Sequence, residues 1–123
     1  MAEREAFEWM EAMAVRTREF AVRCLRLCDA LPKRSVGHAV SGQLSRSGTS
    51  VGANFRAARR ARSKKEYAAK LFITREEADE TVYWLEIIEH ADLLPKHRIE
   101  ALQQGAEELL KIINKLIQNT RRN

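Results

Sequence analysis

Apolar residues recur at spacings of three and four along most of the chain, and this repeat limits the folds that the chain can form. The pattern is clearest near the C-terminus, at Ile99, Leu102, Ala106, Leu109, Ile113 and Leu116. An earlier run with the same spacings includes one polar residue and comprises Phe7, Met10, Ala14, Thr17, Ala21, Cys24, Cys28 and Leu31. Because an α-helix has about 3.6 residues per turn, such spacing places these side chains on one helix face. The pattern predicts long amphipathic helices around a shared core.

Prolines and a capping sequence divide this pattern into four segments. Leu31-Pro32 ends the first helix and Pro95 opens the last, since proline disrupts a helix interior. Ser63-Lys-Lys-Glu66 fits a capping box, in which the serine accepts from the glutamate amide and the glutamate reaches back. We expect helices at about 4–31, 35–62, 64–94 and 96–118, followed by a fraying tail, Asn119–Asn123. Short turns make neighbours antiparallel, so residues 1–123 are expected to form one all-α domain, an up-down-up-down four-helix bundle.

Charge is distributed unevenly along the chain. Residues 32–65 carry a net charge of +9 with no acidic residue, whereas residues 66–94 carry −6. Six basic residues cluster near the second turn, and they are the candidates for contacts with nucleic-acid phosphates: Arg56, Arg59, Arg60, Arg62, Lys64 and Lys65. No aromatic residue alternates with them, so binding would depend on phosphates and show little sequence preference.

The third helix has more apolar surface than one bundle needs. Tyr67, Leu71, Ala78, Val82 and Leu85 form one face, and a second face contains Ile73, Trp84, Ile87, Ile88 and Ala91. Two apolar faces on one helix indicate burial against another subunit as well as within the bundle. In the second helix, Gly48 and Gly52 lie one turn apart, which permits a close backbone approach. The expected oligomer interface comprises Gly48, Gly52, Ile73, Glu76, Glu80, Trp84 and Ile87.

The motifs of familiar catalytic and metal sites are missing from the sequence. Cys24 and Cys28 have no further ligands nearby and are interpreted as buried thiols. His38, His90 and His97 lack the Glu-x-x-His pattern of di-iron bundles. We therefore expect no enzyme activity, no cofactor and no metal. The charged N-terminus does not resemble a signal peptide, and no apolar run suits a membrane span, so a cytoplasmic location is expected.

Three segments resemble the four-helix proteins encoded by intervening sequences of bacterial 23S rRNA genes. They are Gln43-Leu-Ser-Arg-Ser-Gly-Thr-Ser-Val-Gly-Ala-Asn54, Ser63-Lys-Lys-Glu-Tyr67, and the run Glu76-Glu-Ala-Asp-Glu-Thr-Val-Tyr-Trp-Leu-Glu86 with its continuation to Leu94. The resemblance implies a ring-like homopentamer without established enzyme activity. It also implies kinship with the accessory protein of diversity-generating retroelements, and hence RNA, DNA or a reverse transcriptase as partners. The basic stretch Phe55–Arg62 departs from the acidic-glycine element of many members.

Two hypotheses for the function follow. In the first, the protein is a structural or protein-interaction oligomer, and arginines of the second helix pair with carboxylates of the third, within or between subunits. In the second, the arginines face solvent, and the protein binds nucleic acid through its phosphates. The first hypothesis is the leading one, because the basic and acidic blocks are adjacent in the sequence and similar in size.

Overall fold

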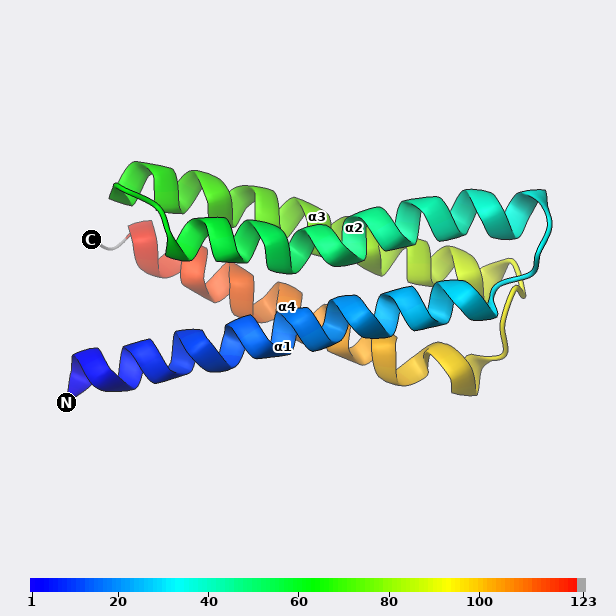
Figure 1. Ribbon diagram of the computed structural model, residues 1–123, viewed down its shortest axis with the longest axis horizontal. Helices are drawn as coiled ribbons and strands as arrows, with labels where there is room; N and C mark the ends of the chain where they lie inside the picture. Colours follow the sequence, from blue (N-terminus) through cyan, green and yellow to red (C-terminus); the bar gives the residue numbers. More distant parts are fainter. Residues whose placement is uncertain (122–123) are drawn as a thin grey trace.

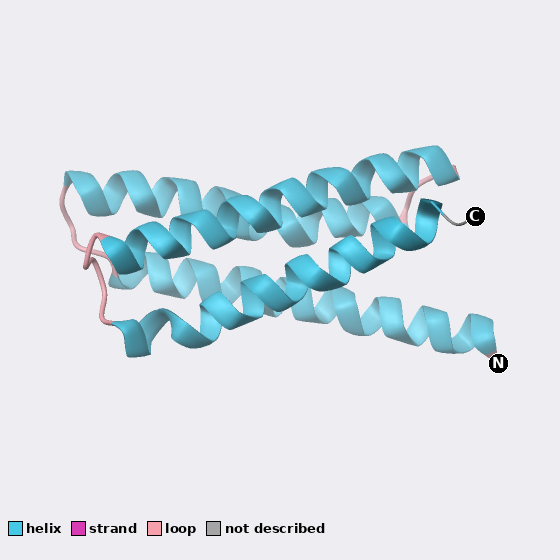
Figure 2. Cartoon of the chain, turned by 180° about the vertical axis from the view of Figure 1, so that it is seen from behind, coloured by secondary structure: helices cyan, strands magenta, loops and turns pink. Residues whose placement is uncertain are grey.

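The computed structural model describes residues 1–121, which form four helices joined by short turns (Figure 1). The helices are α1 (Ala2–Ala30), α2 (Ser35–Arg59), α3 (Lys64–His90) and α4 (Lys96–Arg121). Helices that follow one another in sequence pack side by side and antiparallel, whereas α1 packs much less extensively on α4. Viewed from behind, the loops are confined to the two ends of the bundle (Figure 2). The predicted all-α, up-down four-helix bundle is confirmed.

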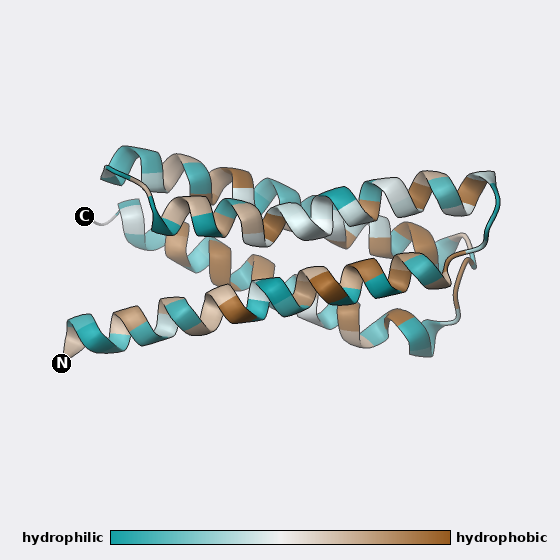
Figure 3. Ribbon diagram, viewed as in Figure 1, coloured by the Kyte–Doolittle hydropathy of each residue, from teal (hydrophilic) through white to brown (hydrophobic). Residues whose placement is uncertain are grey.

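One hydrophobic core runs along the bundle and receives side chains from every helix. The fully buried large residues include Leu44 and Phe55 of α2, Leu71 and Leu85 of α3, and Ile113 of α4. Figure 3 shows that the middle of α2 is pale, because small residues of intermediate hydropathy occupy it. The few buried polar groups are hydrogen-bonded; for example, Thr81 Oγ1 lies 3.0 Å from Ser47 Oγ across the α2–α3 contact. Because these buried polar groups have hydrogen-bond partners, their burial does not destabilise the core.

The spacing pattern identifies most of the core and fails at helix ends. In α4, the buried face follows the predicted positions from Ile99 to Ile113 and then continues at Ile117, with Leu116 half-buried. In α1, the expected core residue Phe7 is 62% exposed, because this end of α1 stands away from the other helices.

The first helix ends within one residue of the predicted position, the next two end at least three residues early, and the last ends three residues late. The second helix ends at Arg59 instead of continuing to Arg62, because Ser63 must be extended (φ −155°, ψ 161°) to cap α3. Ser63 Oγ accepts from the Glu66 amide at 3.0 Å, as predicted, whereas the Glu66 carboxylate approaches the Arg62 amide at 3.4 Å. The last helix continues to Arg121, so its end does not fray at Asn119 as expected. The rest of the predicted tail, residues 122–123, lies outside the described residues.

The third helix ends at His90, four residues before the predicted end at Leu94. Asp92 has a left-handed conformation (φ 55°), the Asp92 amide donates to Glu89 O, and the Leu93 amide donates to Ile88 O. This arrangement is a Schellman motif, in which glycine is the usual left-handed residue. The sequence did not reveal it because aspartate occupies that position.

Replacing Asp92 with glycine should stabilise the protein by about 0.5 kcal/mol. The left-handed conformation costs an L-residue about 1–2 kcal/mol, and the greater freedom of glycine in the unfolded chain offsets part of the gain. Urea unfolding of the purified variant should show a higher midpoint with an unchanged slope. A lower midpoint would mean that the Asp92 side chain contributes more than the backbone strain costs.

The contact between α1 and α2 depends on glycine. A Cβ atom built at Gly48 would lie 2.7 Å from Cys24 Sγ, and one at Gly52 would lie 3.3 Å from Thr17 Oγ1. The close approach predicted for this pair of glycines is therefore present, and α1 of the same chain is the helix that makes it. Gly48 is buried there.

Candidate functional site

The six basic candidates lie together at one end of the bundle. Arg56 and Arg59 lie in the last turn of α2, Arg60 and Arg62 in the connection, and Lys64 and Lys65 in the first turn of α3. All except the half-buried Arg59 are exposed. The structure thus brings the predicted residues to one basic surface, which combines a helix C-terminus, a turn and a helix N-terminus.

Arg59 differs from the other basic residues because α1 engages it. Its Nη2 lies 2.5 Å from Glu11 Oε1, and its guanidinium carbon lies 5.9 Å from the centre of the Phe7 ring. Arg62 has only a loose pair with Glu66 at 4.0 Å, and exposed pairs of this kind contribute little. Among residues 1–121, the side chains of Arg56, Arg60, Lys64 and Lys65 show no ion pair, hydrogen bond or ring contact.

The acidic block of α3 pairs within the chain with Arg46, from the middle of α2. Arg46 Nη1 donates to Glu77 Oε2 at 3.0 Å, and Arg46 Nη2 pairs with Glu80 Oε2. Glu80 also accepts from Trp84 Nε1 at 3.1 Å. Within the chain, Arg59 pairs with Glu11 of α1 and not with the acidic block of α3. Arg46 and Glu11 were missed, although the antiparallel register of α2 and α3 was a usable signal for Arg46.

The outer face of α3 is apolar and acidic. Ile73 is 38% exposed and Tyr83 is 52% exposed, while Trp84 and Ile87 are half-buried. Glu76 is exposed on the same helix, beside the Glu80 carboxylate. Five of the seven expected interface residues thus share one accessible face of α3: Ile73, Glu76, Glu80, Trp84 and Ile87. The other two, Gly48 and Gly52, face α1 of the same chain.

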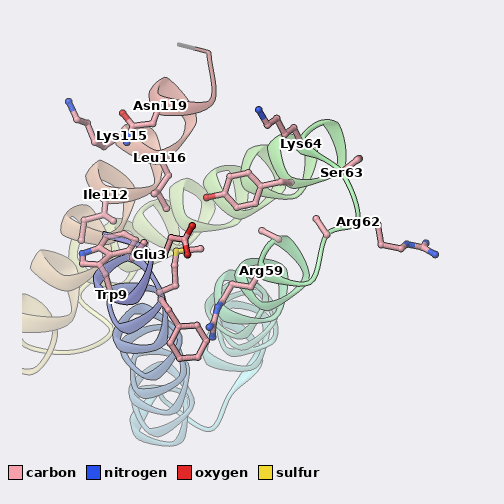
Figure 4. Close-up of a pocket in the computed structure, with 16 residues that line it drawn as sticks. Glu3, Trp9, Arg59, Arg62, Ser63, Lys64, Ile112, Lys115, Leu116 and Asn119 are labelled. Atoms are coloured by element: carbon pink, nitrogen blue, oxygen red, sulfur yellow. The ribbon is translucent and has the colours of Figure 1, made fainter. Parts of the chain in front are cut away.

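A large apolar groove opens beside the basic surface and was not expected from the sequence (Figure 4). Its volume is about 1060 Å³, and it lies between the N-terminal end of α1 and the adjacent ends of α2, α3 and α4. The apolar walls include Phe7, Met10, Tyr67, Ile112 and Leu116. The spacing pattern assigned Phe7 and Met10 to the core, and it cannot show that a helix end diverges from its neighbours.

Comparisons with known proteins address the family directly. The model of the 23S rRNA-intervening sequence protein family matches residues 11–115. The chain belongs to this family. A crystal structure of a protein of unknown function, from the S23 ribosomal protein family of Bacteroides thetaiotaomicron, has 33% sequence identity and a TM-score of 0.82. That similarity covers 89% of this chain and 97% of the other. The search of curated proteins gives no match.

The family match includes one candidate surface entirely and another in part. All six basic residues and the outer face of α3 lie within residues 11–115. Phe7, Trp9 and Met10, which line one wall of the groove, precede the matched range.

The structure also locates the residues considered for metal or redox chemistry. His38, His90 and His97 are all exposed. Within residues 1–121, no three His, Cys, Asp or Glu side chains form a group that could hold a metal ion. In the same range, none of the helices has the length and apolar character needed to cross a membrane.

Burial raises the pKa of the Cys24 thiol from 9.0 to about 12, with a smaller contribution from neighbouring Cys28. The folded state therefore holds a proton that the unfolded state loses, so stability falls as pH rises from about 9 towards 12. We expect a loss of roughly 2 kcal/mol from this thiol by about pH 10.5. Urea unfolding at pH 8 and pH 10.5 measures the loss, and Cys24→Ala should lose less. Equal losses in the two proteins would contradict the assignment.

Proposed function

We propose that the protein is a non-enzymatic homo-oligomer of the 23S rRNA-intervening sequence type, acting as a structural or protein-interaction module. The observation that supports this is the outer face of α3, where Ile73, Tyr83, Trp84 and Ile87 remain accessible beside carboxylates. Scattered apolar residues need no explanation, but aligned aromatic and aliphatic side chains on one helix mark an interaction surface. A pentameric ring is the assembly that the resemblance implies.

A surface of opposite charge lies on another side of the bundle. Between α1 and α2 there is a depression of about 530 Å³, lined by Val15, Gly52, Arg18, Arg56 and Arg60 among others. A basic, small-residue surface of this kind complements an apolar and acidic helix face. Contacts between two different surfaces of the same chain are heterologous, and such contacts close into a ring when the rotation between subunits permits. Charge complementarity would then set the register between subunits.

Light scattering of the purified protein at micromolar concentration tests this proposal. The wild-type mass should be several times 14.1 kDa, and Ile73→Glu should lower it by placing a charge in an apolar contact. Val36→Glu is the matched control, because Val36 is similarly exposed but begins α2. Circular dichroism should show all three proteins helical. A wild-type protein that stays monomeric at high concentration contradicts the proposal.

A second candidate function is phosphate-dependent binding of RNA or DNA. The observation in its favour is that Arg56, Arg60, Lys64 and Lys65 are exposed and their side chains have no partner among the described residues. In an oligomer, each subunit would repeat this basic surface and multiply the phosphate contacts. Such binding would weaken with salt and show little sequence preference.

Fluorescence anisotropy with labelled duplex DNA tests the second candidate. Arg56→Gln with Arg60→Gln should weaken binding and reduce the log–log salt slope by up to about 1.8, since each phosphate contact contributes about 0.9. The control is Arg34→Gln with Arg98→Gln, which removes the same charge from the opposite end of the bundle. Equal effects of both double variants would show that net charge, and not this surface, determines binding. No binding by wild type at low salt would reject the candidate.

A further inference from the structure

The groove between the N-terminal end of α1 and the adjacent ends of the other helices exposes an unusual amount of apolar surface. Residues 1–9 are all exposed, with Phe7 62% and Trp9 44% accessible. In Figure 4, Trp9 lies on the α4 side of the groove near Ile112, and Leu116 reaches into the groove from α4. Apolar side chains that converge on a concave surface of about 1060 Å³ favour an occupant with an apolar face of its own.

The rim of the groove is basic. Arg62, Lys64 and Lys115 line it, and Glu3 is the acidic residue among the lining side chains. Lys64 and Lys115 form no ion pair within residues 1–121, and Arg62 has only the 4.0 Å contact with Glu66. An occupant with carboxylates beside its apolar face would therefore find unpaired cations at the edge of the groove.

The start of α1 has the complementary composition. Between Ala2 and Ala12, the segment carries four glutamates, one arginine and the apolar residues Phe7, Trp9 and Met10. Its glutamates are Glu3, Glu5, Glu8 and Glu11. It is an acidic amphipathic helix, the kind of ligand that enters apolar grooves in proteins.

This segment cannot easily fill the groove of its own chain. The first helix is continuous from Ala2 to Ala30 and contains no glycine or proline at which it could bend sharply. The segment therefore forms one wall of the groove of its own chain and leaves the space between that wall and the ends of α3 and α4 open to another copy. A reciprocal contact between two copies would cover both the groove and the apolar face of the segment, because each copy contributes one segment and one groove to a two-fold interface.

We propose that the groove receives the N-terminal segment of α1, residues 2–12, from a second copy of the chain. Phe7, Trp9 and Met10 of one copy pack against Tyr67, Ile112 and Leu116 of the other, while the glutamates approach Lys64 and Lys115. This contact is separate from the outer face of α3 and does not depend on a ring. Most of the segment precedes the residues that the family model matches.

A charge-exchange experiment tests the proposal. It uses the full chain with Ile73→Glu, so that the proposed α3 contact is weakened and the two interfaces can be distinguished. In sedimentation experiments this parent should form a species of twice 14.1 kDa. Glu3→Lys with Glu5→Lys makes the segment basic, and Lys64→Glu with Lys115→Glu makes the rim acidic. Each double variant alone should dimerise at least about tenfold more weakly, because like charges then meet.

An equimolar mixture of the two double variants should restore the dimer, since a basic segment then meets an acidic rim and an acidic segment meets a basic rim. Lys33→Glu with Arg98→Glu, at the opposite end of the bundle, is the matched control and should leave dimerisation unchanged. Circular dichroism should show each variant to be helical. The proposal is overturned if the parent is monomeric, if the double variants dimerise like the parent, or if two helical variants fail to associate when mixed.

Discussion

Replacing Gly37 with alanine should lower the free energy of unfolding by about 3 kcal/mol, as for a severe overpacking substitution. A Cβ atom at this position would lie 1.8 Å from the carbonyl oxygen of Pro32 and 2.8 Å from its carbonyl carbon. Both atoms belong to the backbone of the α1–α2 turn, so no side-chain rotation can relieve the clash. Urea unfolding monitored by circular dichroism measures the loss. A change of less than about 0.5 kcal/mol would mean that the turn moves freely.

Gly42→Ala is the matched control for this prediction. The same methyl group at Gly42 meets nothing within 4 Å, and the residue is exposed in the interior of α2. Alanine is favoured over glycine in a helix by about 1 kcal/mol, so this variant should be more stable than wild type. If Gly37→Ala lowers the free energy of unfolding while Gly42→Ala raises it, the loss at Gly37 is due to the steric clash and not to helix propensity.

Leu109→Ala should destabilise the bundle by about 2–5 kcal/mol, because it leaves a cavity in a close-packed core. Leu109 is only 1% exposed and lies on the continuous buried face of α4. Its neighbour Leu110 is half-buried, and Leu110→Ala removes the same atoms with a smaller expected loss. Thermal and urea unfolding of both variants provide the comparison. Similar losses at the two positions would contradict the observed orientation of α4.

The sequence was sufficient to predict the fold wherever a regular pattern continued through a helix. The buried face of α4 and the N-cap at Ser63 agree with the structure, because spacing and capping are local properties. The end of α3 was misplaced, since Asp92 adopts the left-handed conformation that is usually associated with glycine. Phe7 was wrongly assigned to the core, since periodicity reveals which face of a helix is apolar but not where a neighbouring helix stops.

Which charged residues come together at the candidate surfaces depends on how α2 and α3 align, and composition does not show that alignment. These helices reverse direction around Arg62, and Ser47 therefore lies opposite Thr81. The same register places Arg46 beside Glu77 and Glu80. Arg56 and Arg59 are then aligned with the first turns of α3, away from its acidic block. Adjacent charge blocks of opposite sign in a sequence are thus weak evidence for pairing unless the register is also considered.

Neither the spacing pattern nor the register of α2 and α3 could have revealed the groove. It arises because the start of α1 diverges from the other helices, a tertiary property to which the whole core contributes. Once the ends of the four helices are placed, Tyr67, Ile112 and Leu116 converge, although they come from distant parts of the sequence. Basic residues without interleaved aromatics in sequence can therefore still have aromatic neighbours in space, as Arg59 has in Phe7.

The contact of Gly48 with Cys24 gives the protein an internal reporter of its own opening. The Cys24 side chain is completely buried, and its sulfur lies in the narrow space that the absence of a side chain at Gly48 creates. A thiol reagent can reach it only while the first two helices are transiently separated. The alkylation rate of Cys24 therefore measures how often this pair of helices parts. Repeating the measurement at several denaturant concentrations would show whether that separation is a local event or part of global unfolding.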